Sequence, residues 1–225
     1  MKEKKELTLA LETVVNGGSI SLLAGESEID FRVGDDESLR AQNFLKQIRD
    51  LLQKNKISPS EIGEIAVATG PGSFTGIRIG ISVALGLKTA WRCRISGISI
   101  LEAMKSFVFQ TGLITTKGSA IIISAIPFGK EDVCWQIFQN FENKNKLESK
   151  SPQVAALGDF MNLVDGYNGF SLITEQSLFK LLRNLGIWGS EKSKIINLGD
   201  NLARFVGFSV NQCDFSDLSP IYVQR

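Results

Sequence analysis

A glycine-rich turn between an apolar strand and a helix constrains this chain more than any other feature. The strand is predicted over residues 65–69, and the helix is predicted from about Ile77 to Arg92. The turn between them consists of Gly70, Pro71, Gly72, Ser73, Phe74, Thr75 and Gly76. Its glycines let another group approach the backbone closely, and Ser73 or Thr75 can cap a helix whose first amides can bind an anion. The turn therefore fits either a tight strand-to-helix connection without a ligand or a contact to a phosphate or nucleotide.

The residues around the turn exclude two common nucleotide motifs. A P-loop requires Lys and then Ser or Thr after its last glycine, and here Ile77 and Arg78 follow. A dinucleotide fingerprint requires glycine at the sixth position of GxGxxG, and Thr75 stands there. Arg78 can reach an anion in the turn, or it can be an ordinary surface or ion-paired side chain. Glu12, at the end of the first predicted strand, can face a phosphate–metal site or bond the backbone amides of the turn around residues 17–18.

Two predicted helices carry faces that suit close packing. The helix after the turn has Gly76, Gly80 and Ala84 at a spacing of four residues, although each interior glycine costs roughly 1 kcal/mol relative to alanine. Such a smooth row serves either internal packing against the sheet or a close contact with a partner helix. The preceding helix, predicted over about residues 39–54, has an apolar arc wider than covering a sheet edge requires. The arc consists of Phe44, Leu45, Ile48, Leu51 and Leu52.

The chain of 225 residues contains no histidine, which removes several kinds of catalytic site. Ser-His-Asp and Cys-His nucleophile systems, HExxH zinc sites and imidazole acid–base chemistry all require it. Cys93, Cys134 and Cys213 have no CxxC spacing, so we expect no metal and interpret them as small buried residues in a reducing cytosol. A net charge of +1 argues against a dedicated nucleic-acid surface. No apolar stretch reaches the ~18 residues of a membrane span.

The remaining pattern predicts strands and helices in two related halves. In the first half, strands are predicted over residues 7–12, 19–23 and 28–33, and a helix start over 98–105. In the second half, strands are predicted over 119–126, 132–138, 170–174 and 194–198, and helices near 155–164, 176–185 and 200–206. Each half opens with a strand–turn–strand unit followed by alternating helices and strands, which suggests two related lobes.

Several stretches together resemble one protein family. Residues 68–80, Ala-Thr-Gly-Pro-Gly-Ser-Phe-Thr-Gly-Ile-Arg-Ile-Gly, closely resemble the signature of the bacterial TsaB family, also called YeaZ. The segments 9–13 and 19–23 resemble that family's opening hairpin, and 97–103 resemble the segment after its signature helix. Residues 220–225 resemble its C-terminal ending. The resemblance is specific over residues 7–104 and the last six residues, and vague over 105–215.

This resemblance implies an α/β fold of the ASKHA type, two lobes with duplicated mixed sheets flanked by helices. We expect a lobe over residues 1–104 that holds the signature loop and the dimerisation helices. We expect a smaller, divergent lobe over residues 105–225, whose C-terminal segment packs back on the first lobe.

The resemblance also implies a function in forming N6-threonylcarbamoyladenosine at position 37 of ANN-decoding tRNAs. In that family TsaB is a non-catalytic, cytoplasmic sibling that dimerises with the catalytic subunit TsaD, which transfers the threonylcarbamoyl group from threonylcarbamoyl-AMP. TsaE is an ATPase partner, and tRNA binds to the assembled complex. Without its partner, TsaB can form a homodimer. TsaD-type proteins carry a His-x-x-x-His metal site, which a chain without histidine cannot have. No catalytic residue and no cofactor are expected here.

Two groups of residues follow as site predictions. The signature loop, a candidate nucleotide or anion contact, comprises Gly70, Pro71, Gly72, Ser73, Phe74, Thr75, Gly76 and Arg78. The partner interface comprises Phe44, Leu45, Ile48, Leu52, Gly80 and Ala84.

The chain departs from the family pattern at three places. Glu12 stands where the family usually has Asp, and Arg40 where it often has His. Residues 124–127, Ser-Ala-Ile-Pro, replace the Asp-Ala-Arg that commonly follows the second lobe's main strand. The alternative function is a stand-alone ASKHA nucleotide-binding enzyme such as a small kinase, which needs a carboxylate base and metal ligands in a cleft. A peptidase-like protein is a third alternative, but its nucleophile systems are missing.

Overall fold

A computed structural model of the chain describes residues 6–15, 17–34, 41–114, 121–139, 148–187, 193–210 and 217–224. Arg40, Cys213 and most of the charged stretch 142–150 lie outside these ranges. The chain divides into two compact units. The first comprises residues 1–103 and 201–222, and the second comprises residues 104–200 and 223–225. The division falls within α3 (Ile100–Gln110).

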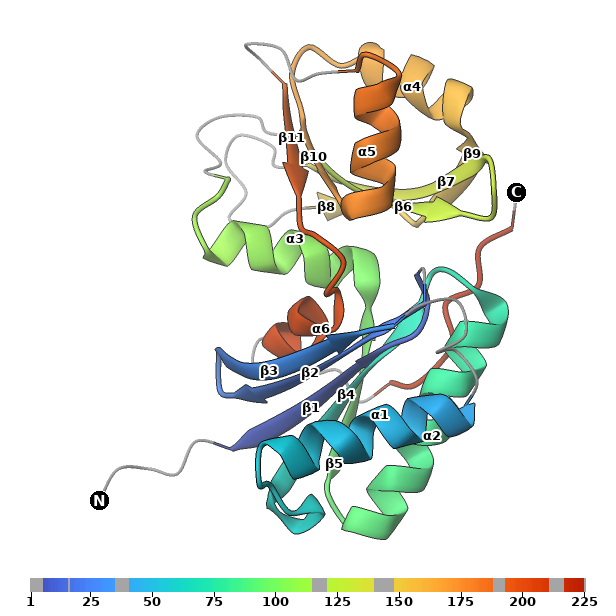
Figure 1. Cartoon of the computed structure of the whole chain (residues 1–225). Helices are drawn as coiled ribbons and strands as arrows, with labels where there is room; N and C mark the ends of the chain where they lie inside the picture. The colour runs from blue at the N-terminus through green and yellow to red at the C-terminus, as the bar shows by residue number, and fades with distance from the viewer. Residues whose placement is uncertain are drawn as a thin grey trace. The chain divides into compact units, whose positions relative to one another are not determined.

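The first unit contains a five-stranded mixed sheet in the order β3-β2-β1-β4-β5 (Figure 1). These strands are β1 (Leu7–Glu12), β2 (Ser19–Ala24), β3 (Ser27–Val33), β4 (Ile62–Gly70) and β5 (Arg94–Ser99). The first three form an antiparallel meander, and β4 and β5 continue the sheet in parallel with β1. A turn of 3₁₀ helix, η1 (Pro59–Glu61), leads into β4.

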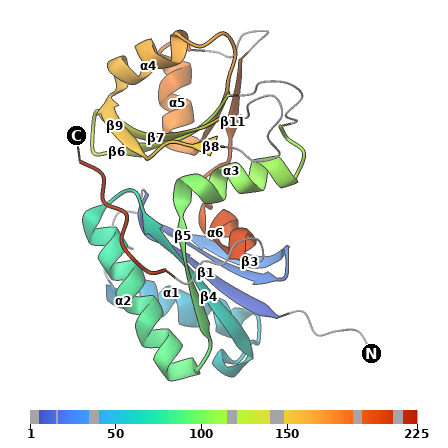
Figure 2. The same ribbon diagram turned by 180° about the vertical axis from the view of Figure 1, so that it is seen from behind.

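Helices cover both faces of this sheet. Figures 1 and 2 show α1 (Ala41–Lys54) and α2 (Phe74–Trp91) on one face and α6 (Ala203–Ser209) on the other. Successive residues of a strand point to opposite faces, so Leu9 and Leu11 join the core under α1 and α2 while Ala10 faces α6. At Gly207 of α6 a Cβ would meet the side chains of Ala10 and Leu23. The helix therefore approaches the sheet as closely as a glycine allows.

The second unit repeats this plan. Its sheet has the order β11-β10-β6-β7-β8, with β9 also pairing β7. These strands are β6 (Ile121–Phe128), β7 (Asp132–Gln139), β8 (Glu148–Ser149), β9 (Gln153–Ala156), β10 (Ser171–Thr174) and β11 (Lys194–Asn197). Two helices, α4 (Leu157–Asp165) and α5 (Gln176–Asn184), pack on one face around the Trp135–Phe160 ring pair, whose centroids lie 5.1 Å apart.

The predicted fold class is confirmed, because both units share one sheet topology. In each, an antiparallel hairpin (β1–β2 or β6–β7) is extended by two parallel strands on one side and an antiparallel strand on the other. The predicted helix start at 98–105 is wrong at its beginning. Residues 94–99 form β5, and the helix begins at Ile100. Pairing with β4 outweighs the weak strand pattern around Gly97, a residue with low strand propensity.

Candidate functional site

The glycine-rich turn connects β4 to α2 and is fastened to the hairpin turn that follows β1. The Ser73 backbone amide donates to the carbonyl of Val14, with 2.8 Å between N and O. Ser73 is also the N-cap of α2, because its hydroxyl accepts from the Gly76 amide at 3.1 Å. The amides of Ser73 and Gly76 are therefore bonded within the chain, as expected for a tight strand-to-helix turn.

The glycines of the turn are required by the chain's own backbone. Gly70 and Gly72 have φ angles of +117° and +147°, which side-chain-bearing residues rarely adopt. A Cβ on Gly70 would lie 2.6 Å from the Ile221 carbonyl oxygen, and one on Gly72 would overlap the Val14 carbonyl. A Cβ on Gly76 would overlap the carbonyl of Thr13. Close approach of the hairpin turn and of the C-terminal segment thus accounts for all three glycines.

The small-residue row of α2 faces inward, against the end of β1. The Thr13 hydroxyl donates to the Gly76 carbonyl at 2.7 Å, and a Cβ on Gly80 would overlap that same hydroxyl. Ala84 is fully buried in the core under the sheet. Gly80 and Ala84, predicted at a partner interface, therefore pack internally. The reason is that the first turns of α2 need backbone-level contact with residue 13.

The apolar arc of α1 also serves the unit's own core. Phe44, Ile48, Leu51 and Leu52 are 0–3% exposed and pack in one cluster with β1, β2 and β4. Of the positions predicted on α1 for the partner interface, Phe44, Ile48 and Leu52 are thus enclosed. Leu45 is 43% exposed and is the one of these predicted α1 positions that a partner can reach.

The outward side of α2 carries two exposed apolar residues, Phe74 and Leu85, of which the sequence-based site predictions included only Phe74. Phe74 is 52% exposed, and Leu85, three helical turns later on the same side, is 42% exposed. The guanidinium carbon of Arg78 lies 3.8 Å from the Phe74 ring centroid, so this cation stacks on the aromatic face. Helical spacing from Phe74 (i, i+4, i+11) would have identified Leu85 from the sequence. We call Phe74, Arg78 and Leu85, with the stacked Tyr222 described next, the outer α2 surface.

The C-terminal segment completes this site. The Ile221 amide donates to the Thr69 carbonyl at 2.8 Å, just before the turn. The Tyr222 ring then lies against Phe74, with 5.0 Å between ring centroids. Figures 1 and 2 show this segment running beside α2. The expectation that the C-terminal segment packs back on the first lobe named none of these contacts, which join residues about 150 positions apart in the sequence.

The Glu12 carboxylate is committed to the hairpin turn. It is 1% exposed and accepts the amides of Val14 and Val15 at 2.6 and 2.8 Å. It also accepts the Ser19 hydroxyl at 3.2 Å, and that hydroxyl accepts the Ala203 amide at 2.9 Å. Of the two interpretations of Glu12, the one in which it bonds turn amides holds, and the amides belong to residues 14 and 15.

The other candidate positions are structural. Ser124, Ala125 and Ile126 are buried inside β6 and pair with β7, while Pro127 follows in the same strand. Burial raises the pKa of the Cys134 thiol to about 12 and, less strongly, that of Cys93. Among the described residues, no three His, Cys, Asp or Glu side chains are grouped so that they could hold a metal ion. No described helix combines the length and apolar character needed to cross a membrane.

Comparison with known proteins gives a consistent set of relatives. Residues 39–164 match the model of the family TsaD, tRNA N6-adenosine threonylcarbamoyltransferase. The "tRNA threonylcarbamoyladenosine biosynthesis protein TsaB" of Escherichia coli (strain K12) is 31% identical over 136 residues, 60% of this chain and 56% of that protein. The protein of the same name from Buchnera aphidicola subsp. Baizongia pistaciae is 30% identical over 145 residues, 64% of this chain and 63% of that protein. The matching part of this chain thus spans little more than half the length of these relatives.

Solved structures show the same fold. YeaZ from Pseudomonas aeruginosa superimposes with a TM-score of 0.63 at 20% identity, covering 96% of this chain and 99% of that one. An inorganic polyphosphate/ATP-glucomannokinase from Arthrobacter sp. strain KM superimposes with a TM-score of 0.53 at 11% identity, covering 92% and 98% of the two chains. The kinase shares the two-lobed architecture, as the predicted ASKHA class requires.

Proposed function

Because the chain belongs to the TsaD family of tRNA N6-adenosine threonylcarbamoyltransferases and is a relative of the TsaB (YeaZ) proteins, we propose that it is a non-catalytic subunit of the complex that forms threonylcarbamoyladenosine in tRNA. In this role it binds a TsaD-like catalytic subunit and supports the transfer of the threonylcarbamoyl group. A TsaE-like ATPase is the third protein of the complex. The chain acts in the cytoplasm, where its tRNA substrate is.

The observation that carries this proposal is the outer α2 surface. A helix that packs its inner side on a sheet normally turns a polar side to solvent, yet α2 presents Phe74 and Leu85 outward. An exposed phenylalanine stacked with an arginine and a tyrosine, with an exposed leucine further along the same helix side, is typical of a protein interface. The proposed partner surface therefore comprises the outer α2 surface and Leu45 of α1.

The hydrogen bonds of the candidate site residues favour a non-catalytic role for this chain. The buried Glu12 carboxylate accepts two amides and a hydroxyl, so it is unsuited to act as a base on a substrate. The amides of Ser73 and Gly76 are bonded within the chain. With no histidine in the sequence, the chain cannot supply the histidine pair with which TsaD-type proteins hold a metal.

The tRNA substrate is proposed to bind mainly through the partner. Lys and Arg supply most of the affinity for the phosphate backbone, and this chain, with 25 basic against 24 acidic residues, has no overall basic excess to attract tRNA. In the absence of TsaD, the same exposed apolar residues are expected to support a homodimer.

The kinase-like alternative rests on fold alone. The glucomannokinase shares the architecture at 11% identity, which carries no residue-level argument. A kinase also needs a carboxylate that can accept the proton of the substrate hydroxyl. Glu12, the candidate that the sequence offered, is already committed to the hairpin turn.

A reconstituted modification reaction tests the proposal. With threonylcarbamoyl-AMP and an ANN-decoding tRNA, the chain alone should transfer nothing. Added to TsaD and TsaE from the same organism, it should raise the transfer rate at least about tenfold, equivalent to ~1.4 kcal/mol of activation free energy. Nucleotide turnover by the isolated chain that is lost in Glu12→Gln would instead favour the kinase-like alternative.

A further inference from the structure

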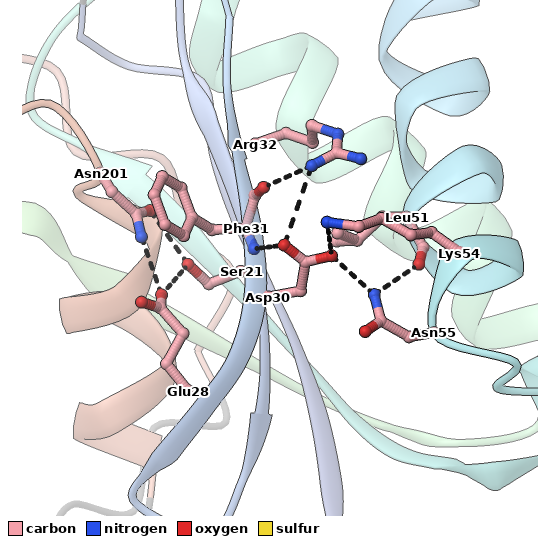
Figure 3. A network of polar contacts seen from close by, with 9 residues as sticks. All are labelled: Ser21, Glu28, Asp30, Phe31, Arg32, Leu51, Lys54, Asn55 and Asn201. Atoms are coloured by element: carbon pink, nitrogen blue, oxygen red, sulfur yellow. Dashed lines mark hydrogen bonds and ion pairs between the residues drawn. The ribbon is translucent and has the colours of Figure 1, made fainter.

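Two side chains of the outermost strand of the first sheet close its free edge. Among the described residues, β3 is the last strand of the order β3-β2-β1-β4-β5, and one side of its backbone has no neighbouring strand. At Phe31, the outward amide donates to the Asp30 carboxylate at 2.9 Å. The outward carbonyl of Phe31 accepts from the Arg32 guanidinium at 3.0 Å. Both backbone groups that an added strand would use at this residue are thus occupied (Figure 3).

Contacts from α1 hold the Asp30 carboxylate in this position. Lys54 pairs with it at 2.7 Å and the Asn55 side chain donates to it at 2.8 Å. The same Asn55 amide group donates to the Leu51 carbonyl at 2.9 Å, which fixes it to the end of the helix (Figure 3). The carboxylate is therefore oriented by the helix before it accepts the Phe31 amide.

A second polar group fixes the beginning of the strand. The Glu28 carboxylate accepts the Ser21 hydroxyl and the Asn201 side-chain amide, each at 2.7 Å. Figure 3 shows this group and the Asp30 group along the same strand. The pairing of β3 with β2 has a β-bulge between these two groups, at Ile29, so the strand bends there. The contacts on both sides of the bulge keep β3 from fraying.

The side chains along this edge are complementary to those of a second copy. Ile29, Phe31 and Val33 are 42–45% exposed and alternate with Asp30 and Arg32. If two β3 strands pair antiparallel about Phe31, Asp30 lies opposite Arg32 and Phe31 opposite itself, and Ile29, beside the bulge, comes near Val33. Every cross-strand pair is then apolar, aromatic or of opposite charge. The apolar and aromatic pairs of Ile29, Phe31 and Val33 remain when Asp30 and Arg32 are replaced, so a second copy of this chain is the partner that fits.

We propose that β3 is a latent self-pairing edge, which Asp30 and Arg32 keep closed by capping the backbone of Phe31. Removing the two caps exposes a donor and an acceptor beside three apolar side chains. The chain then adds β3 of another copy and joins the two five-stranded sheets. This inference does not depend on the proposed function.

The test compares Asp30→Ala/Arg32→Ala with wild type and with Lys54→Ala. The control removes the Lys54 ion pair, while the Asn55 hydrogen bond still holds the Asp30 carboxylate at the Phe31 amide. In light scattering over a range of concentrations, the double variant should associate at least about tenfold more tightly than wild type, as two recovered hydrogen bonds allow. Lys54→Ala should behave like wild type. Hydrogen exchange of the Phe31 amide in dilute protein should be faster in Asp30→Ala than in wild type.

A charge at the symmetry centre identifies the partner. Adding Phe31→Lys to the double variant places two like charges opposite each other only if β3 pairs with β3, so it should return the mass to the wild-type value. Circular dichroism establishes that each variant is folded. The proposal is overturned if the folded double variant gains no mass, if Phe31→Lys leaves the added mass unchanged, or if the Phe31 amide exchanges equally fast in Asp30→Ala and wild type.

Discussion

At the scale of single residues, buried or paired carboxylates are used to fix turns and edges. Glu12 is one methylene longer than the Asp that the family resemblance led us to expect. It spans the amides of Val14 and Val15 and the hydroxyl of Ser19. Through Ser19 it is linked to the amide of Ala203 at the start of α6. A residue that the sequence marked as a candidate for chemistry thus joins the hairpin to a helix nearly two hundred residues away.

Glu12→Gln should therefore destabilise the fold. The side chain keeps its shape but loses its charge, and hydrogen bonds to charged groups are worth about 1.5–3 kcal/mol each, so we expect a loss of about 2 kcal/mol overall. Denaturant unfolding monitored by circular dichroism measures it. Complex formation should persist while the variant is folded. An unchanged unfolding free energy would show that the carboxylate is not structural.

Asp30 gives the chain a predictable response to acid. A hydrogen bond from Lys54, and then one from Asn55, lowers the pKa of the Asp30 carboxyl from its ordinary 3.8 to about 2. The folded state thus binds this proton more weakly than the unfolded state. The stabilisation is complete above about pH 5 and is lost as the pH falls toward 2.

Asp30→Asn should consequently flatten the pH dependence of the unfolding free energy between about pH 5 and 2. Because Lys54 is largely exposed and screened by water, the loss at neutral pH should be only about 0.5–1 kcal/mol. Chemical denaturation at a series of pH values measures both. If the unfolding free energies of wild type and Asp30→Asn depended on pH in the same way, the lowered pKa of Asp30 would be contradicted.

At the scale of elements, α2 is a helix with two different sides. On its inner side, Gly76 lies against the Thr13 carbonyl and Gly80 against the Thr13 hydroxyl. Its outer side carries Phe74, Arg78 and Leu85. The sequence contains both patterns, but a row of small residues alone does not reveal which side faces the sheet.

Two glycines of α2 should respond oppositely to alanine. At Gly76 a Cβ would overlap the Thr13 carbonyl, so Gly76→Ala must shift backbone and should cost about 2–3 kcal/mol. At Gly86 nothing lies within 4 Å, so Gly86→Ala should gain up to about 1 kcal/mol from helix propensity. Thermal unfolding of the two variants and of wild type measures these opposite changes in stability. Equal effects at the two positions would refute the packing described for the turn.

An exposed residue on the outer side of α2 offers a variant that tests partner binding without disturbing the fold. Leu85→Glu places a charge on the proposed partner surface, and since Leu85 is already 42% exposed it should leave the fold intact. A charge in an interface centre should weaken binding to TsaD at least about thirtyfold, equivalent to ~2 kcal/mol. Leu181→Glu is the matched control, a leucine equally exposed on α5 of the second unit. Calorimetric titration measures the affinity of each variant for TsaD. Equal affinities for Leu85→Glu and Leu181→Glu would contradict the proposed partner surface.

At the scale of the whole molecule, local patterns indicated two related halves, and the family resemblance implied their duplicated mixed sheets. Alternating apolar strands around Gly17 and around Gly129 mark the two hairpins, and the helices between later strands follow 3.6-residue periodicity. The strand β5 was missed because Gly97 interrupts its pattern and its pairing with β4 is not local.

The candidate site was only partly predictable for the same physical reason. The sequence identified the glycine-rich turn, but the groups that require its glycines come from residues 13, 14 and 221, which are distant along the chain. It identified the apolar arc of α1, but could not tell that Phe44, Ile48 and Leu52 are consumed by the unit's own core. Roles in anion contact and in partner binding stay predictions.

The central claim is that this chain works by binding a TsaD-like subunit, and the mass of the mixture tests it most directly. Size-exclusion chromatography with light scattering should be run on the chain, on TsaD from the same organism, and on both together. The mixture should contain a new species with the mass of one copy of each, formed at micromolar concentration, as expected for an interface that buries on the order of 1,600 Å². Two proteins that elute separately, each with its own mass unchanged by mixing, would contradict it.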